Sequence, residues 1–364
     1  MIEIARFARG DDIRLRAFNA RLAASGFRLP TTPEELSTPA EPGAGPWTDL
    51  WVAHVAGTVR GGYLLKHETL WLRGKTTPIG NFQLPLSEGI LDRRFAAVGL
   101  ALAQHAQRQA DALYSLGMGD VARPLPKLLA RLGWSVEPVP FYFRILNGGA
   151  VARHLRAFDS TAARRALRRS LAASGLASAG AWAWRVAARL AGPRRERGLR
   201  LVAVDRFDER VDEVQSQCLA AYPALLDRRA VALNIKFPAG DPRLLRFLLK
   251  SEGRVAGWLV LSCNLLRDHK QFGDLRLGCL VDGLCAPHQV AAAVWLASRE
   301  LAAAGVDLIV SNQAHRAWRR GLRANLFLAG PSNFILARTA AFAPAVALPD
   351  LHVNRGDGDG PINL

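Results

Sequence analysis

The chain carries an internal repeat at a constant offset of 196 residues. The segment that begins Gly57-Thr-Val-Arg-Gly aligns without a gap with the segment that begins Gly253-Arg-Val-Ala-Gly, and the same register places Leu84 on Leu280. Single matches are common in a chain that is 50% apolar, but an ungapped register from residue 57 to residue 113 is not. Because a fixed offset indicates copies of one structural unit, we predict that the two halves share one fold.

Length and composition indicate a soluble globular protein of about two domains. The first residues lack the apolar run of a signal peptide, and the uncharged run at 170–184 is too short to span a bilayer, which takes about 18 residues. The four cysteines form no Cys-x-x-Cys pair and the eight histidines show no ligand spacing, so we expect no metal site, no disulfide framework and a cytoplasmic location. These cysteines are Cys218, Cys263, Cys279 and Cys285.

Apolar periodicity predicts the same order of elements in both halves. In the second half it predicts helices over Glu209–Tyr222, Val290–Ala304 and Ala314–Arg323, and strands over Val202–Val204, Arg254–Cys263, Leu275–Leu284, Val306–Ser311 and Ser332–Arg338. In the first half it predicts helices over Phe95–Ala110 and Pro124–Leu132, and strands over Asp111–Leu116 and Val139–Ile145 as the last two. Each half is therefore expected to be an α/β layered unit, a mixed and mostly antiparallel sheet flanked by helices. The predicted boundaries are 1–150 for the first unit, 151–200 for a basic helical linker, and 201–364 for the second unit with its C-terminal tail.

This order, with a long helix after the fourth strand, resembles the GNAT acyltransferase superfamily, and the duplication resembles its tandem and FemAB-like members. The segment from Gly305 to Asn312, with Trp318 and Phe327 after it, looks like the strand, asparagine and helix of that family. The run Arg229-Ala-Val-Ala-Leu-Asn-Ile-Lys-Phe resembles a short motif of tandem relatives. The resemblance covers most of the chain outside 150–200.

In that family, the turn between the fourth strand and the next helix binds the pyrophosphate of acetyl-CoA or another acyl-CoA. Free backbone N–H groups and the helix dipole favour an anion there. The resemblance places Arg93, Arg94, Val98 and Gly99 at this turn in the first half, and Gln289 in the second. Both copies depart from the glycine pattern of the family, so weakened donor binding is predicted, with the first half as the better candidate.

Glu88 and Asp282 lie at the ends of the two fourth strands and are the carboxylates expected to face a cleft and act as general bases. His315, near a predicted helix start, is a further candidate because imidazole titrates near neutrality. The resemblance places Trp318 and Leu129 where many relatives have a general-acid tyrosine, and neither can donate a proton. Exposed or capping roles remain open for all three candidates.

Residues 161–200 hold ten arginines and one glutamate, about half of the net charge of +17. With Trp182 and Trp184, the arginines predict two amphipathic helices that lie on an anionic membrane surface, contact RNA phosphates, or pack on one domain as a linker. The tail Gly356-Asp-Gly-Asp-Gly lacks the twelve-residue calcium pattern. One hypothesis folds it back between the two copies, with Asp357 and Asp359 near substrate.

Three functions follow. The first is an acyltransferase that moves an acyl group from acyl-CoA to an amine, such as an amino sugar in envelope or exopolysaccharide synthesis, with peripheral contact to the inner membrane face through 161–200 if the acceptor is lipid-linked. The second is a FemAB-like transferase that uses aminoacyl-tRNA, with the basic segment as its tRNA contact. The third is a scaffold or membrane-associated partner in which both sites are degenerate.

Overall fold

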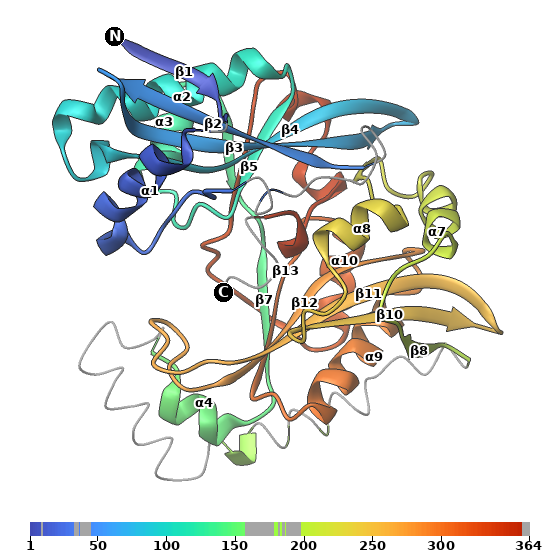
Figure 1. The fold of residues 1–364 in the computed structure, drawn as a ribbon. Coiled ribbons are helices and arrows are strands. Elements are labelled where there is room, and N and C mark those ends of the chain that lie inside the picture. The colour runs from blue at the N-terminus through green and yellow to red at the C-terminus, as the bar shows by residue number, and fades with distance from the viewer. Residues whose placement is uncertain are drawn as a thin grey trace.

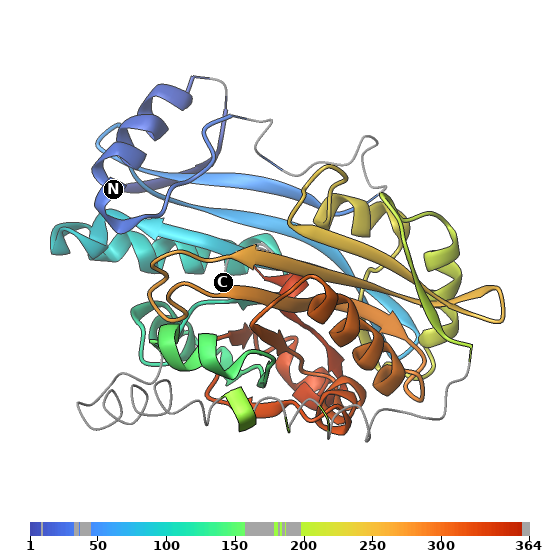
Figure 2. The same cartoon turned by 90° about the horizontal axis from the view of Figure 1, so that it is seen from below.

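A computed structural model gives the structure and describes residues 1–8, 10–32, 36, 45–156, 178–180, 183, 186 and 198–358. Most of the basic segment and Asp359 lie outside the described residues, so the helices predicted there stay predictions. Two sheets lie one above the other in Figure 1, and Figure 2 shows the same two layers from below. Within the described part, no helix is long and apolar enough to cross a membrane.

The first sheet has nine strands. They are β1 (Ile2–Arg6), β2 (Trp47–Val55), β3 (Thr58–Leu72), β4 (Lys75–Ser87), β5 (Leu113–Leu116), β6 (Ser135–Pro138), β9 (Ala224–Leu226), β15 (Ile335–Arg338) and β16 (Leu351–His352). The main path runs β1-β2-β3-β4-β5-β15-β6. Outside this path, β9 pairs with the end of β3, and β16 pairs with β9. The pairs β4–β5 and β9–β16 are parallel, and the other pairs are antiparallel.

The second sheet has seven strands in the order β14-β7-β13-β12-β11-β10-β8. They are β7 (Phe141–Ile145), β8 (Arg200–Ala203), β10 (Leu244–Ser251), β11 (Arg254–Leu265), β12 (Arg276–Cys285), β13 (Leu308–Asn312) and β14 (Leu328–Gly330). The pair β12–β13 is parallel, as β4–β5 is in the first sheet. The α/β class and the two mostly antiparallel sheets flanked by helices are therefore confirmed.

The helices that matter for function follow the expected order. They are α1 (Asp12–Arg21), α2 (Ala96–Gln109), α3 (Pro124–Arg131), α4 (Gly148–His154), α7 (Arg210–Cys218), α8 (Ala230–Lys236), α9 (Val290–Ala303) and α10 (Arg316–Ala324), with the short 3-10 helices η3 (Glu88–Ile90), η4 (Arg93–Phe95) and η7 (Arg355–Asp357). The helix predicted over Glu209–Tyr222 is shorter than expected, because α7 ends at Cys218 and the chain then turns into β9.

The closing strands of the two halves are exchanged. β7, predicted as the last strand of the first half, pairs with β13 in the second sheet, where Phe143 lies opposite Val310. In return, β15 from the second half lies between β5 and β6 of the first sheet, with Ala337 opposite Ser115. In Figure 1, β7 crosses from the upper layer into the lower one. The predicted boundaries at 150 and 201 therefore divide the chain but not the two sheets.

A large apolar core lies on the second sheet and is centred on the fully buried Trp258 and Trp318. The first half has smaller cores, one of which joins Tyr63, Phe82 and Trp134 beneath α2 and α3. These cores hold the fourth strand and the following helix of each half in fixed positions. The candidate sites lie at the ends of these elements.

Candidate functional site

The parallel strands β4 and β5 separate soon after they meet. They pair at Gly80–Leu113 and Asn81–Tyr114, and within the described residues the ladder ends there. In the second half, β12 and β13 stay paired from Leu277 as far as Cys279 and then separate in the same way. Separated parallel strands leave backbone N–H and C=O groups along which an extended ligand can lie.

A β-bulge marks the point of separation in both halves. In β4 the register with β3 shifts at Leu84, whose backbone is left-handed with φ of 47°. In β12 the register with β11 shifts between Leu280 and Asp282. Leu84 and Leu280 are the residues that the repeat places on one another, so the duplication extends to this irregularity. Bulges re-aim strands and occur often beside binding sites.

The first turn of α2 is open to solvent. Ala96 and Ala97 are exposed, and no side chain of the described residues caps this helix start. Arg93 and Arg94 are exposed in η4 directly before it, with Arg94 bound to Asp92 at 2.7 Å. The N–H of Ala96 donates to the carbonyl of Arg93. The helix dipole and the two arginines still make this turn a positive site that suits an anion.

Of the other residues predicted at this turn, Val98 is buried and can offer a ligand its backbone but not its side chain. Gly99 is half-buried within α2, and a Cβ there would meet only Ser87, at 3.9 Å. Ala97 has helical rather than left-handed backbone, so replacement of the family's glycine costs no strain at this position. The structure thus brings the four predicted first-half residues to one helix start.

The corresponding start of α9 is covered. A Cβ on Gly321 of α10 would lie 2.7 Å from Val290 and 3.3 Å from the backbone nitrogen of Ala291, so the two helices touch there. Asn325 donates a hydrogen bond to the carbonyl of Ala291 at 2.8 Å. Gln289, predicted to hold a cofactor, is the N-cap residue of α9 and is half-buried beside this contact. A ligand phosphate has less access here than at α2.

Glu88 does not face an open cleft. It is 4% exposed, and its carboxylate binds the guanidinium groups of Arg21 and Arg60, the latter at 2.5 Å. Arg60 also lies over the ring of Phe95, 4.3 Å from its centre, next to the start of α2. The expectation of a free base at the end of β4 fails because two arginines already occupy the carboxylate oxygens.

His315 caps α10, where its Nδ1 accepts a hydrogen bond from the N–H of Ala317 at 3.3 Å. Its ring lies 4.4 Å from that of Tyr222, and the residue is buried. Burial, helped by the charge of Arg316, lowers the pKa of His315 to about 4. It is therefore neutral near pH 7, with its acceptor nitrogen in use.

Asp282 belongs to a feature that sequence reasoning did not find, a buried ionic cluster between the two sheets. We define the buried ionic cluster as Lys66, Glu68, Arg228, Lys236, Asp282 and Asp357, three cations and three anions that are each at most 9% exposed. Asp282 binds Arg228 at 3.0 Å and accepts a hydrogen bond from Asn354. Burial raises the pKa of Asp282 despite the positive charge of Arg228.

The C-terminal tail closes the buried ionic cluster. The carboxylate of Asp357 binds Arg228 at 2.6 Å and Lys236 at 2.9 Å, and Lys236 reaches Glu68 of β3 at 3.0 Å. Asn81 of β4 donates to the carbonyl of Asp357 at 3.0 Å. The tail therefore folds back between the halves, as hypothesised, and its Asp357 is fully paired. Desolvation opposes ionisation, but the two cations hold the pKa of Asp357 well below its usual range.

No group of three or more histidine, cysteine or acidic side chains is placed to hold a metal ion in the part of the chain that the structure describes. Burial raises the pKa of the Cys218 thiol and of the Cys279 thiol to about 11. Such thiols stay protonated and weakly nucleophilic near neutral pH.

No family model matches the chain, and no curated protein matches it. Solved structures match the chain in fold. A GCN5-related N-acetyltransferase from Anabaena variabilis ATCC 29413 aligns with a TM-score of 0.53 and 11% identity over 93% of this chain and 72% of its own. A probable N-acyltransferase of unknown function from Enterococcus faecalis V583 gives 0.53 and 10% over 94% and 73%. Saccharomyces cerevisiae N-myristoyltransferase with bound myristoyl-CoA gives 0.51 and 12% over 93% and 82%. At such low identity the likeness establishes the GNAT-type fold alone.

Proposed function

We propose that the protein is an N-acyltransferase that binds its acyl-CoA donor at the start of α2. The observation that carries this proposal is the contrast between the two halves. The first turn of α2 is exposed and follows Arg93 and Arg94. The first turn of α9 is buried at Val290 and Ala292. The neighbour that holds myristoyl-CoA on the same fold supports the donor class.

In this proposal the donor phosphates bind the first-turn N–H groups of α2, and the thioester arm enters the separation of β4 from β5. The acceptor amine attacks the thioester carbonyl, a C–N bond forms and the C–S bond breaks. The nitrogen loses one proton, and the leaving thiolate takes up one. Glu88 acts as a positioning residue, because it holds Arg60 beside Phe95 near the phosphates. Asp282 and His315 are buried in the second half and serve structural roles.

The acceptor follows from resemblance alone. We propose an amine acceptor, of which an amino sugar of an envelope or exopolysaccharide precursor is one class, and a cytoplasmic location for the reaction. The basic segment 161–200 would bring the protein to the inner membrane face if the acceptor is lipid-linked. The two units proposed at 1–150 and 201–364 share this single donor site.

The proposal is tested by Ala97→Glu and calorimetric titration with acetyl-CoA and longer acyl-CoAs. An acidic residue in the first helical turn stabilises the helix by about 0.3–1 kcal/mol, so folding is preserved. The same carboxylate repels the donor phosphates, and we expect affinity to fall about ten-fold or more. The wild-type protein is expected to bind one acyl-CoA per chain.

His288→Glu is the matched control, because it adds the same charge on an exposed residue just before α9. It should leave acyl-CoA affinity unchanged. If both variants lowered acyl-CoA affinity equally, the effect would come from the overall charge of the protein rather than from the start of α2. If no acyl-CoA binds the wild-type protein at all, the proposed function is wrong.

The aminoacyl-tRNA reading rests on one observation, the ten arginines of 161–200. It requires tRNA affinity that falls steeply as salt rises. Binding of tRNA that is lost on deletion of this segment, in a protein that binds no acyl-CoA, would favour it. A protein that binds neither acyl-CoA nor tRNA but does bind vesicles would favour the scaffold function.

A further inference from the structure

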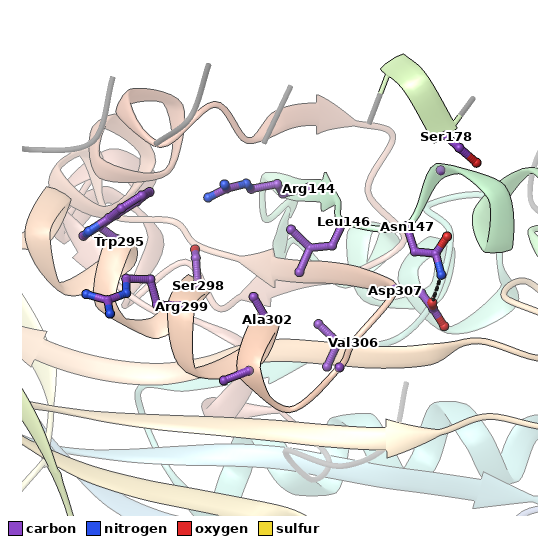
Figure 3. A pocket seen from close by; sticks show the side chains of 13 residues that line it. Arg144, Leu146, Asn147, Ser178, Trp295, Ser298, Arg299, Ala302, Val306 and Asp307 are labelled. Carbon is purple, nitrogen blue, oxygen red and sulfur yellow. Dashed lines mark hydrogen bonds between the residues drawn. The ribbon is translucent and has the colours of Figure 1, made fainter. Parts of the chain in front are cut away.

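A second site lies on the outside of the second half, apart from α2. A pocket of about 960 Å³ opens where the end of β7 and the start of α4 face the C-terminal part of α9 (Figure 3). Leu146, Ala302 and Val306 give it apolar walls, and Trp295 stands at one end. This volume is within the range of pockets that bind small molecules, about 300–1,000 Å³.

The group that singles out this pocket is Arg144 of β7. Its residue is 5% exposed, and its side chain extends into the pocket between α9 and the sheet (Figure 3). Its Nε and Nη1 atoms are buried and have no hydrogen-bond partner among the described residues. A buried charge without a partner is costly, and such a group is normally paired.

Two other polar groups of the pocket, Ser298 and Asp307, are already engaged. Ser298 donates to the carbonyl of Val294 at 2.8 Å. At the far end from Trp295, Asp307 accepts hydrogen bonds from Asn147 at 2.8 Å and from the N–H of Arg276 at 2.9 Å (Figure 3).

A further cation adds to the charge at the Trp295 end. Arg299 is exposed on α9 beside Trp295 and faces the same end of the pocket as Arg144 (Figure 3). One end of the pocket is therefore cationic with unused donors, and the walls beyond it are apolar.

We propose that this pocket binds a small amphiphilic anion, with a carboxylate or phosphate monoester on Arg144 and an apolar chain along Leu146, Ala302 and Val306. The unpartnered Nε and Nη1 groups leave the charge of the guanidinium uncompensated, and this charge attracts the head group into a charge-assisted hydrogen bond. Arg299 adds attraction at the mouth. The inference does not depend on the proposed acyl transfer, because it rests on a different face and different residues.

The probes are decanoate, decyl phosphate, inorganic phosphate and neutral decanol, titrated calorimetrically into the full-length protein. Decanoate or decyl phosphate is expected to bind at one site per chain, at least about ten-fold tighter than inorganic phosphate or decanol, because only the amphiphiles use both ends of the pocket. Vesicles that contain phosphatidic acid test whether the anionic head group belongs to a membrane lipid or to a free amphiphile. Equal binding of inorganic phosphate and decyl phosphate would overturn the proposal, as would no binding of either amphiphile.

Arg144→Met tests the residue. It removes an unpaired buried charge while it keeps an apolar side chain, so we expect amphiphile affinity to fall about ten-fold or more and the melting temperature of the free protein to rise by about 2 °C. Arg246→Met is the matched control. Arg246 is also buried, but its guanidinium donates to the carbonyls of Phe237 at 3.0 Å and Leu244 at 3.1 Å, so its loss should lower the melting temperature and leave amphiphile binding intact. A lower melting temperature for Arg144→Met with unchanged amphiphile affinity would show a structural arginine and overturn the proposal.

Discussion

At the scale of single residues, His315 shows how burial creates a pH dependence of stability. Its pKa is lowered from 6.5 to about 4, chiefly by burial. As the pH falls below 6.5, the unfolded chain takes up this proton before the folded chain does. The contribution of His315 to the free energy of unfolding therefore decreases as the pH falls from 6.5 to about 4, and His315 contributes no pH dependence above that window.

His315→Asn removes the titrating group but keeps a side chain that can accept the N–H of Ala317 as an N-cap. We expect the loss of stability between about pH 7 and about pH 4.5 to shrink by up to about 3 kcal/mol relative to wild type, measured by urea unfolding. His315→Ala also removes the titration but loses the cap, so the two variants should share one pH profile at different absolute stabilities. A variant profile as steep as that of wild type would contradict the assignment.

At the scale of elements, sequence periodicity located the helices that define each unit. The helix predicted over Val290–Ala304 is observed as Val290–Ala303, and that over Phe95–Ala110 as Ala96–Gln109. Apolar spacing determines these helices locally, and the glycine after α9 ends it. The exchange of β7 and β15 could not be predicted, because alternation identifies a strand but not the neighbour with which it pairs.

The exchange has a measurable consequence. Fragment 1–156 lacks three strands of the first sheet, which are β9, β15 and β16, and fragment 198–364 lacks one strand of the second sheet, which is β7. We expect neither fragment alone to show a cooperative unfolding transition, and we expect the mixture to regain one near that of the intact chain. Thermal unfolding followed by circular dichroism measures this. Cooperative unfolding of either fragment alone would show that the exchanged strand is dispensable.

Sequence reasoning located the helix start of the candidate site, where the signal was local, and the role of its residues stays a prediction. Arg93, Arg94 and Gly99 adjoin a predicted helix start, and the structure places them there. The buried ionic cluster was missed because its ion pairs join residues as far apart in the sequence as Glu68 and Lys236. A single charge in a strand, such as Glu68, is more often at a solvated edge.

At the scale of the whole molecule, the buried ionic cluster connects the two halves of the chain, which the exchanged strands β7 and β15 also connect. Glu68 belongs to the first sheet, Asp282 to the second, Lys236 to α8 and Asp357 to the tail, so four separate parts of the chain meet in one set of charges. The two cations of Lys236 and Lys66 hold the pKa of Glu68 at about 2 against the effect of burial. The charges balance only while the tail is in place.

Asp357→Asn tests this dependence. The substitution keeps the shape of the side chain but removes the charge that Arg228 and Lys236 share at 2.6 Å and 2.9 Å. It leaves excess positive charge in a site without solvent, and loss of one partner of a buried pair costs about 3–5 kcal/mol. We expect a fall of that size in the free energy of unfolding, measured with urea at neutral pH. Asp350→Asn is the control, because Asp350 pairs with the exposed Arg316 and should cost at most about 1 kcal/mol. If the two variants were equally stable, the tail would not be what holds the two halves together, and the apolar cores with the exchanged strands would have to do so alone.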